Sequence, residues 1–422
     1  MEHVVPEREQ SSCWRRNLRI IWLAELVAMI GFTAVSPILP LYVGTLGVLS
    51  QREVRLYAGL VFFVSGAAMA VFSPIWGVLS DRYGRKLNVE RAMFCGAVLM
   101  ALTGLVQNVY QLLLLRVLQG ALTGTVTAVT TFVACAVPRN RSGRALGMLQ
   151  TAIYVGATVG PLLGGTVADT WGYRASFFVT GALLFLGGVI VFLSAEEPPE
   201  GSLCCPPSRG RESGGDRSIR GRVQRQLLPV FGSGALVGVL TIALSVRMAA
   251  RLAGSTLPLF VQSIAASDGR VATITGLISA GTSACGALGS LSLGRLGDRH
   301  GYRRVLPIAV MLAFAFYLPQ AFVGRPIWLL PLQAGAGMAV SGTYVAVRTS
   351  LARLAVRGEE GIVYGIDASA TSVAGALAPM MGSALAAWLG LRVPLLAAAA
   401  LFLFAALLAF RTGYHFDDEP AV

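Results

Sequence analysis

The chain has 422 residues, of which 55% are hydrophobic and only 13% are charged, and its mean hydropathy is +0.67. A soluble protein of this length needs far more polar surface, so the composition excludes that class and indicates a chain built for a lipid bilayer. The formal net charge of +13 would also suit a nucleic-acid-binding protein, but the placement of the basic residues excludes that function.

Apolar runs recur along the whole chain, and each is long enough to cross ~30 Å of hydrocarbon as a helix. They lack the alternating polarity of barrel strands, and a helix satisfies its backbone hydrogen bonds within one segment. The first run is long and carries no cleavage site, so we predict a first span and not a signal peptide. The sequence therefore predicts an all-α membrane protein with about twelve transmembrane helices, at 18–44, 56–79, 92–107, 110–136, 145–168, 175–194, 228–263, 272–294, 305–324, 327–351, 362–388 and 393–411.

The 34 basic residues divide unevenly between the two sides of these spans. With the N-terminus inside, the great majority fall in cytoplasmic segments, which is the positive-inside pattern. We therefore expect both termini in the cytoplasm and assign the charge excess to topology. None of the six cysteines falls in an external loop, so no disulfide framework is expected.

The two halves of the chain repeat each other. Leu39-Pro-Leu-Tyr-Val recurs as Leu257-Pro-Leu-Phe-Val, and Gly172-Tyr-Arg recurs as Gly390-Leu-Arg. Such repeats are typical of transporter folds with a site at the repeat interface. The stretch between the halves is rich in proline, glycine and arginine, which predicts a disordered linker. The predicted organisation is a cytoplasmic tail (1–17), a six-helix bundle (18–195), a cytoplasmic linker (196–226), a second six-helix bundle (227–411) and a second tail (412–422).

The first span contains Glu25 about six residues from its start. An ionisable group in hydrocarbon costs several kcal/mol, which makes it a functional candidate, and burial favours its neutral form. Its spacing to Gly31 and Pro37 resembles the membrane-embedded glutamate of MdfA-type multidrug exporters, although Thr33 stands where those exporters carry a second acid. Glu25 is therefore a candidate proton-coupling residue; the alternative is an interfacial carboxylate paired with Arg19.

The loop after the second span has a counterpart after the eighth. A carboxylate at a helix end can accept from the N-terminal amides of a neighbouring helix, and flanking arginines can form ion pairs. The repeated Gly-x-Leu-x-Asp-Arg-x-Gly pattern resembles the loop signature of the major facilitator superfamily of transporters. We predict a latch on the cytoplasmic side that favours the outward-facing state; the alternative is an ordinary polar turn. The latch candidates are Gly77, Asp81, Arg82, Gly84, Arg85, Asp298 and Arg299.

The fourth span carries Arg116, which has a neutral counterpart, Gln333, in the second half. It resembles the arginine of the superfamily's fourth-helix motif, which is thought to assist proton transfer. The alternative is an arginine whose side chain extends to the membrane interface.

The fifth span has glycine at every fourth position, at Gly156, Gly160 and Gly164. These residues share one helix face and allow another helix to approach closely, while Pro161 removes a backbone donor. Together with Gly165 the pattern resembles the signature of the drug–proton antiporter branch of the superfamily. Simple tight packing is the alternative.

The seventh span contains Arg247 and Arg251, which are four residues apart and share a face. They are expected to face the transport cavity or acidic partners. An anionic substrate, a pair with Glu25 across the bundle interface and a structural ion pair all remain open. Asp367, early in the eleventh span, is either a second proton site or a latch partner near Asp81.

The chain as a whole resembles a twelve-helix drug–proton antiporter, and its short sequence motifs look most like those of the MdtG-type multidrug exporters. The resemblance implies a monomer in the cell (inner) membrane that exports small amphiphilic compounds in exchange for protons. No metal spacing, nucleophile motif or phosphate-binding loop occurs, so we predict no enzyme activity and no cofactor beyond the proton gradient. A nutrient symporter of the same fold and a non-transporting receptor or scaffold are the alternatives.

Overall fold

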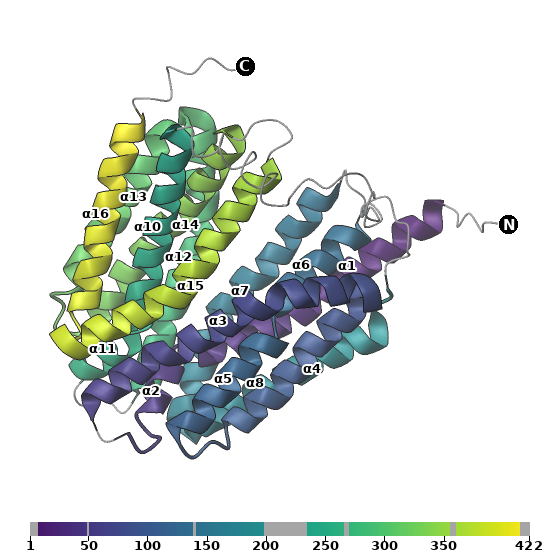
Figure 1. The fold of residues 1–422 in the computed structure, drawn as a ribbon, viewed down its shortest axis with the longest axis horizontal. Helices are drawn as coiled ribbons and strands as arrows, with labels where there is room; N and C mark the ends of the chain where they lie inside the picture. Colours follow the sequence, from purple (N-terminus) through teal and green to yellow (C-terminus); the bar gives the residue numbers. More distant parts are fainter. Residues whose placement is uncertain are drawn as a thin grey trace, which may run out of the picture. The chain divides into compact units, whose positions relative to one another are not determined.

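The computed structural model describes residues 7–48, 50–137, 141–197, 234–265, 270–354 and 360–413, and the regular elements in these ranges are all helices (Figure 1). Ten segments among them are long and apolar enough to cross a membrane. Two further long helices, α4 (Arg85–Thr103) and α14 (Leu329–Leu354), lie where the third and tenth spans are predicted. The predicted linker, apart from its first two residues, and both chain ends lie outside the described ranges.

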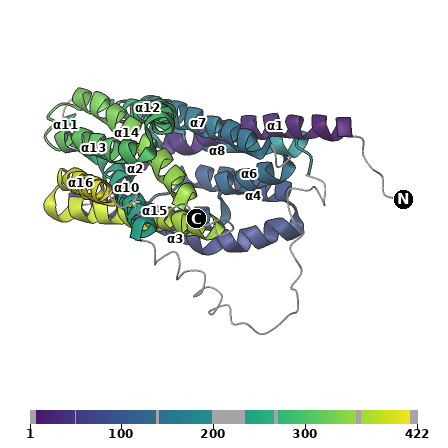
Figure 2. The ribbon, with the colours of Figure 1, turned by 90° about the horizontal axis from the view of Figure 1, so that it is seen from above.

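Contacts divide the chain into two units, the first of which comprises residues 1–39 and 64–213. Within it, α1 packs against both α7 and α8, and α4 packs against α8 (Figure 2). Its helices besides α4 are α1 (Glu7–Val35), the second part of α3 (Gln51–Tyr83), α5 (Val109–Leu122), α6 (Thr125–Ala136), α7 (Ser142–Trp171) and α8 (Tyr173–Ser194).

The second unit comprises residues 40–63 and 214–422. Its apolar core includes Val246 on α10 and the aromatic pair of Tyr317 and Phe402, whose ring centroids are 4.8 Å apart. Its helices besides α14 are α2 (Leu39–Val43), the first part of α3, α10 (Gly234–Gly254), α11 (Leu257–Ile264), α12 (Val271–His300), α13 (Tyr302–Gln320), the short 3-10 helix η2 (Pro326–Trp328), α15 (Glu360–Leu389) and α16 (Val393–Gly413).

Residues 40–63, which the sequence analysis assigns to the first bundle, therefore group with the second unit. Arg55 Nη1 donates to the Ala386 carbonyl oxygen at 3.0 Å, and the Arg52 guanidinium lies 3.3 Å from the centre of the Trp388 ring. These contacts join α3 to the C-terminal end of α15. A single 33-residue helix thus contributes to both units.

Three predicted spans are interrupted. The first and seventh each end in a short separate helix, α2 and α11, which begin at the repeated Leu-Pro-Leu segments. The fourth is divided into α5 and α6 at Gly124, whose φ of 113° is a conformation that favours glycine. By contrast, α7 runs through Pro161 as one helix.

Candidate functional site

The glycine face of α7 lies directly against α1. A Cβ atom on Gly156 would come within 2.5 Å of the Met29 Cβ, and one on Gly160 would overlap the Ile30 carbonyl oxygen. Thr33 Oγ1 donates to the Gly156 carbonyl oxygen at 2.8 Å, which joins α1 to α7. The glycines therefore allow a helix contact that no larger residue would permit.

Glu25 lies on α1 inside the first unit and has no exposed surface. Neither of its carboxyl oxygens has a hydrogen-bond partner among the described residues. Arg19 Nε instead donates to the Arg15 carbonyl oxygen, so the structure does not form the interfacial pair considered above. Burial of a carboxyl group without a hydrogen-bond partner is costly, which makes Glu25 a candidate functional residue.

Arg116 on α5 is also buried, with 8% of its surface exposed. Its Nη1 donates to Gln119 Oε1 at 2.7 Å, whereas Nε and Nη2 have no partner within the described ranges. The side chain is therefore enclosed by the first unit and does not extend to its surface.

Arg247 and Asp367 form a buried ion pair in the second unit. The guanidinium meets the carboxylate with two parallel contacts, Nη1 to Oδ1 at 2.7 Å and Nη2 to Oδ2 at 2.8 Å. Only 5% and 8% of the two side chains are exposed, and the ring of Tyr344 on α14 lies 5.8 Å from the guanidinium. Of the alternatives for Arg247, the structure forms the ion pair, and the partner is Asp367.

Arg251 lies one turn further along α10 and is exposed. Its Nη1 lies 2.6 Å from the place where a Cβ on Gly375 would be, so this glycine of α15 makes room for the guanidinium. No acidic side chain of the described residues lies within ion-pair distance of it.

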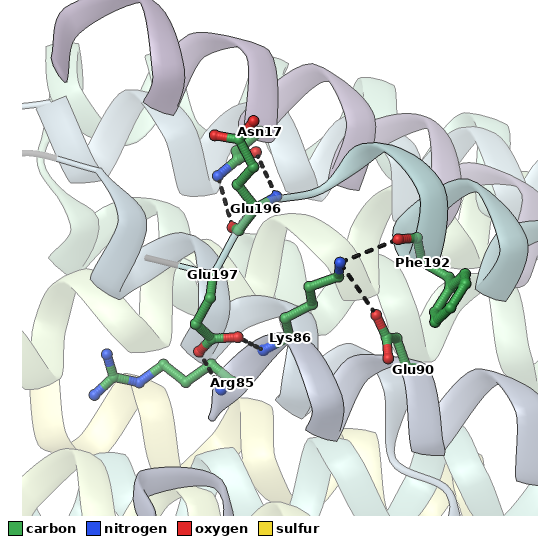
Figure 3. Close-up of polar contacts among 7 residues, drawn as sticks. All are labelled: Asn17, Arg85, Lys86, Glu90, Phe192, Glu196 and Glu197. Carbon is green, nitrogen blue, oxygen red and sulfur yellow. Dashed lines mark hydrogen bonds and ion pairs between the residues drawn. The ribbon is translucent and has the colours of Figure 1, made fainter. Parts of the chain in front are cut away.

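Glu197 binds the start of α4, directly after the turn at Gly84 that separates α3 from α4 (Figure 3). Glu197 Oε1 and Oε2 accept from the backbone amides of Arg85 and Lys86 at 2.6 and 2.8 Å, which caps the N-terminus of α4. The Lys86 ammonium in turn donates to the Phe192 carbonyl oxygen at 3.0 Å. The preceding Gly84 has a φ of 103° and lies against the same carboxylate.

The neighbouring residue, Glu196, fixes the end of α8 to α1. Asn17 Nδ2 donates to the Glu196 carbonyl oxygen at 2.9 Å, and the Glu196 amide donates to Asn17 Oδ1 at 3.1 Å (Figure 3). The Glu196 side chain forms an ion pair with Arg16. Sequence analysis missed both glutamates because it assigned them to the linker by composition.

The predicted latch aspartates differ in what the structure describes. The side chain of Asp81 lies outside the described part of the chain. Asp298, at the end of α12, accepts from the Tyr302 hydroxyl at 2.8 Å. Tyr302 is the first residue of α13, so this bond joins two consecutive helices of the second unit.

Removing the cap on α4 is expected to destabilise the first unit. Glu197→Ala leaves two amides at a helix start without their acceptor, a loss of about 1 kcal/mol. Thermal unfolding of the purified protein in detergent should show this loss of stability as a lower Tm. The matched control is Glu196→Ala, which removes an exposed ion pair and keeps the backbone bonds to Asn17, and it should lower the Tm much less. Equal effects of the two substitutions would contradict the capping role.

Comparison with known proteins agrees with this architecture. The sequence model described as Major Facilitator Superfamily matches residues 21–268 and again 239–421. The chain is 35% identical over 386 residues to the multidrug resistance protein MdtG of Dickeya zeae, covering 92% of this chain and 91% of that protein. It is 32% identical over 394 residues to MdtG of Klebsiella pneumoniae, covering 93% and 92%.

Solved structures show the same fold at low sequence identity. An inward-facing, occupied bacterial homologue of the human lysosomal transporter Spinster superposes with a TM-score of 0.76 at 16% identity, covering 96% of this chain and 98% of that one. The nucleoside transporter NupG superposes with a TM-score of 0.71 at 14% identity, covering 93% and 99%. The predicted fold class, twelve transmembrane helices in two six-helix bundles, is confirmed. With both halves matched by the family and relatives above 30% identity over nearly the whole length, the chain belongs to the Major Facilitator Superfamily and is a secondary transporter, not an enzyme.

Proposed function

We propose that this transporter exports small amphiphilic compounds in exchange for protons, by alternating access. The names of its MdtG relatives support multidrug substrates. The close contact of α7 with α1 through the glycine face supports the antiporter branch. In the same proposal the protein is a monomer in the inner membrane, and the proton gradient is its energy source. The distribution of basic residues along the sequence supports a cytoplasmic location of both termini.

The observation that carries the proton coupling is the isolation of Glu25. Glu25 is fully buried and has no hydrogen-bond partner among the described residues. In this proposal it carries a proton in that state and releases the proton when water or a cation reaches it. Asp367 is in the opposite situation, because the Arg247 guanidinium contacts both of its carboxylate oxygens. Glu25 is therefore the proton carrier of this proposal, and Asp367 belongs to a charged pair that keeps α10 and α15 together.

Arg116 has a supporting role in the proposal. Its guanidinium has two nitrogen atoms without partners, so a carboxylate that loses its proton inside the first unit would find a donor there. The segment from Gly77 to Arg85, which comprises the end of α3, Gly84 and the first residue of α4, is proposed with Asp298 and Arg299 as the latch of the transport cycle. Glu197 fixes the helix that follows this loop.

Glu25→Gln is expected to uncouple transport from the proton gradient, because the amide cannot exchange a proton. Efflux of ethidium, an amphiphilic cation, and of fluorescein, an amphiphilic anion, is measured in inverted vesicles with and without a pH gradient. Proton release on addition of each dye is measured on purified protein with a pH indicator. The parent should release protons and respond to the gradient, and Glu25→Gln should do neither.

The matched control is Glu53→Gln, which changes an exposed glutamate in the first turn of α3 and should behave as the parent. Undiminished proton release by Glu25→Gln would reject Glu25 as the carrier and leave Asp367 as the candidate. If the dye instead moves across the membrane in the same direction as the protons, the result would reject export by antiport in favour of symport.

A further inference from the structure

A cavity of about 60 Å³ lies within the first unit where α3 and α4 meet the junction of α5 and α6. None of the charged residues assigned to proton coupling lines it. Each water molecule needs roughly 10–15 Å³ of such space, so the cavity has room for several waters or for one small polar group. The described residues that line it include Arg91 and no acidic residue.

The break in the fourth span borders this cavity, which Thr123, Gly124 and Thr127 line. The last carbonyl groups of α5 are already occupied: Ala121 accepts from Trp76 Nε1 at 2.6 Å, and Leu122 accepts from the Arg91 guanidinium. Thr123 is extended, and Gly124, the residue before α6, has a left-handed conformation and provides no side-chain cap. The first amides of a helix have no partner within it, so the junction presents donors and the positive end of the α6 dipole.

Arg91 adds a fixed positive charge. Its Nε and Nη2 donate to Asn88 Oδ1 at 3.2 and 2.8 Å, and its guanidinium lies 3.5 Å from the centre of the Trp76 ring. Stacking on an aromatic ring together with these bonds holds the planar group in one orientation. The cation is therefore held in position at the wall of the cavity.

Ser80 is an independent indication that the cavity can bind a ligand. It lines the cavity, is 4% exposed, and its hydroxyl has no hydrogen-bond partner in the described part of the chain. A buried hydroxyl without a partner is unfavourable, and native structures rarely contain one without a bound water, ion or ligand. The hydroxyl is thus available to donate to an occupant of the cavity.

We propose that this cavity binds an oxyanion, namely the carboxylate or phosphate group of a small molecule or of a lipid headgroup. The occupant accepts from the Ser80 hydroxyl and from the first amides of α6, and Arg91 balances its charge. Oriented amides, a hydroxyl and a guanidinium are the donors that such groups use at helix N-termini. The inference does not depend on the proposed direction of transport or on proton coupling.

The test is calorimetric titration of the full-length protein in neutral detergent with inorganic phosphate and, separately, with benzoate, at constant ionic strength. We expect saturable binding of at least one of the two. Ser80→Ala should weaken it roughly tenfold, the amount that a hydrogen bond to a charged group contributes. Since this hydroxyl has no partner among the residues that the structure describes, the substitution should leave folding intact, which the Tm checks.

The matched control is Ser65→Ala, the same change on the same helix at a residue that does not line the cavity; it should bind as the parent does. Repeating the titration in phospholipid nanodiscs separates the two sources of the anion. A free anion binds in detergent and in nanodiscs alike, whereas a headgroup that occupies the site abolishes binding of free phosphate in nanodiscs. Absence of saturable binding in detergent, or equal affinities of parent and Ser80→Ala, would overturn the proposal and leave a water-filled cavity.

Discussion

Arg247→Ala is expected to destabilise the second unit by about 3–5 kcal/mol, because it leaves the Asp367 carboxylate buried and unpaired. The two side chains make a bidentate contact at 2.7 and 2.8 Å with almost no exposure to solvent. Thermal unfolding in detergent should show a lower Tm, and transport should fall with the population of folded protein. Asp367→Asn should have a smaller effect, because the amide oxygen still accepts one bond.

Arg251→Ala is the matched control on the same helix, four residues away. Arg251 is exposed and has no acidic partner among the described residues, so its loss should change the Tm little. The double variant Arg247→Met/Asp367→Leu replaces both charges by apolar groups and should recover most of the stability. A Tm for Arg247→Ala equal to that of Arg251→Ala would mean that the pair does not form.

Gly160→Leu is expected to abolish transport, because even a Cβ atom at this position overlaps the backbone of α1. The added side chain separates two helices whose contact Thr33 stabilises through the Gly156 carbonyl. Dye efflux in inverted vesicles measures the loss, and size-exclusion chromatography shows how much of the variant is folded. Gly160→Ala should already lower both activity and Tm.

Gly147→Ala provides the matched control, since a Cβ at Gly147 on the same helix has nothing within 4 Å. This change should be neutral or slightly stabilising, because alanine favours a helix more than glycine does. Leu186→Ala in α8 removes an exposed side chain and should likewise be mild. Full activity of a stable Gly160→Leu protein would show that the close approach of α7 and α1 is not required.

Local patterns were sufficient to predict the features that depend on one segment. The period of four in α7 identifies a shared glycine face before the partner helix is known. The apolar runs predict the helices, whereas the grouping of residues 40–63 with the second unit was not predicted. Charges at Glu25, Arg116 and Arg247 stand out because each lies within an apolar run.

Features that depend on two distant segments were not predictable in this way. Asp367 and Arg247 are 120 positions apart, and their pairing is decided by the packing of α10 on α15. Glu197 was hidden in a stretch whose composition indicates disorder, although its function comes from the amides at the start of α4. The break at Gly124 has no proline to mark it, and a glycine inside an apolar run is compatible with a continuous helix.

The ion pair of Arg247 and Asp367 also constrains how this sequence can change over evolutionary time. Loss of either partner leaves a buried charge uncompensated, so a lineage cannot replace the two residues one after the other without passing through an unstable intermediate. The two positions should therefore vary together among relatives, as a charged pair or as a pair of apolar residues. Mixed combinations should be found only where another side chain supplies the missing charge.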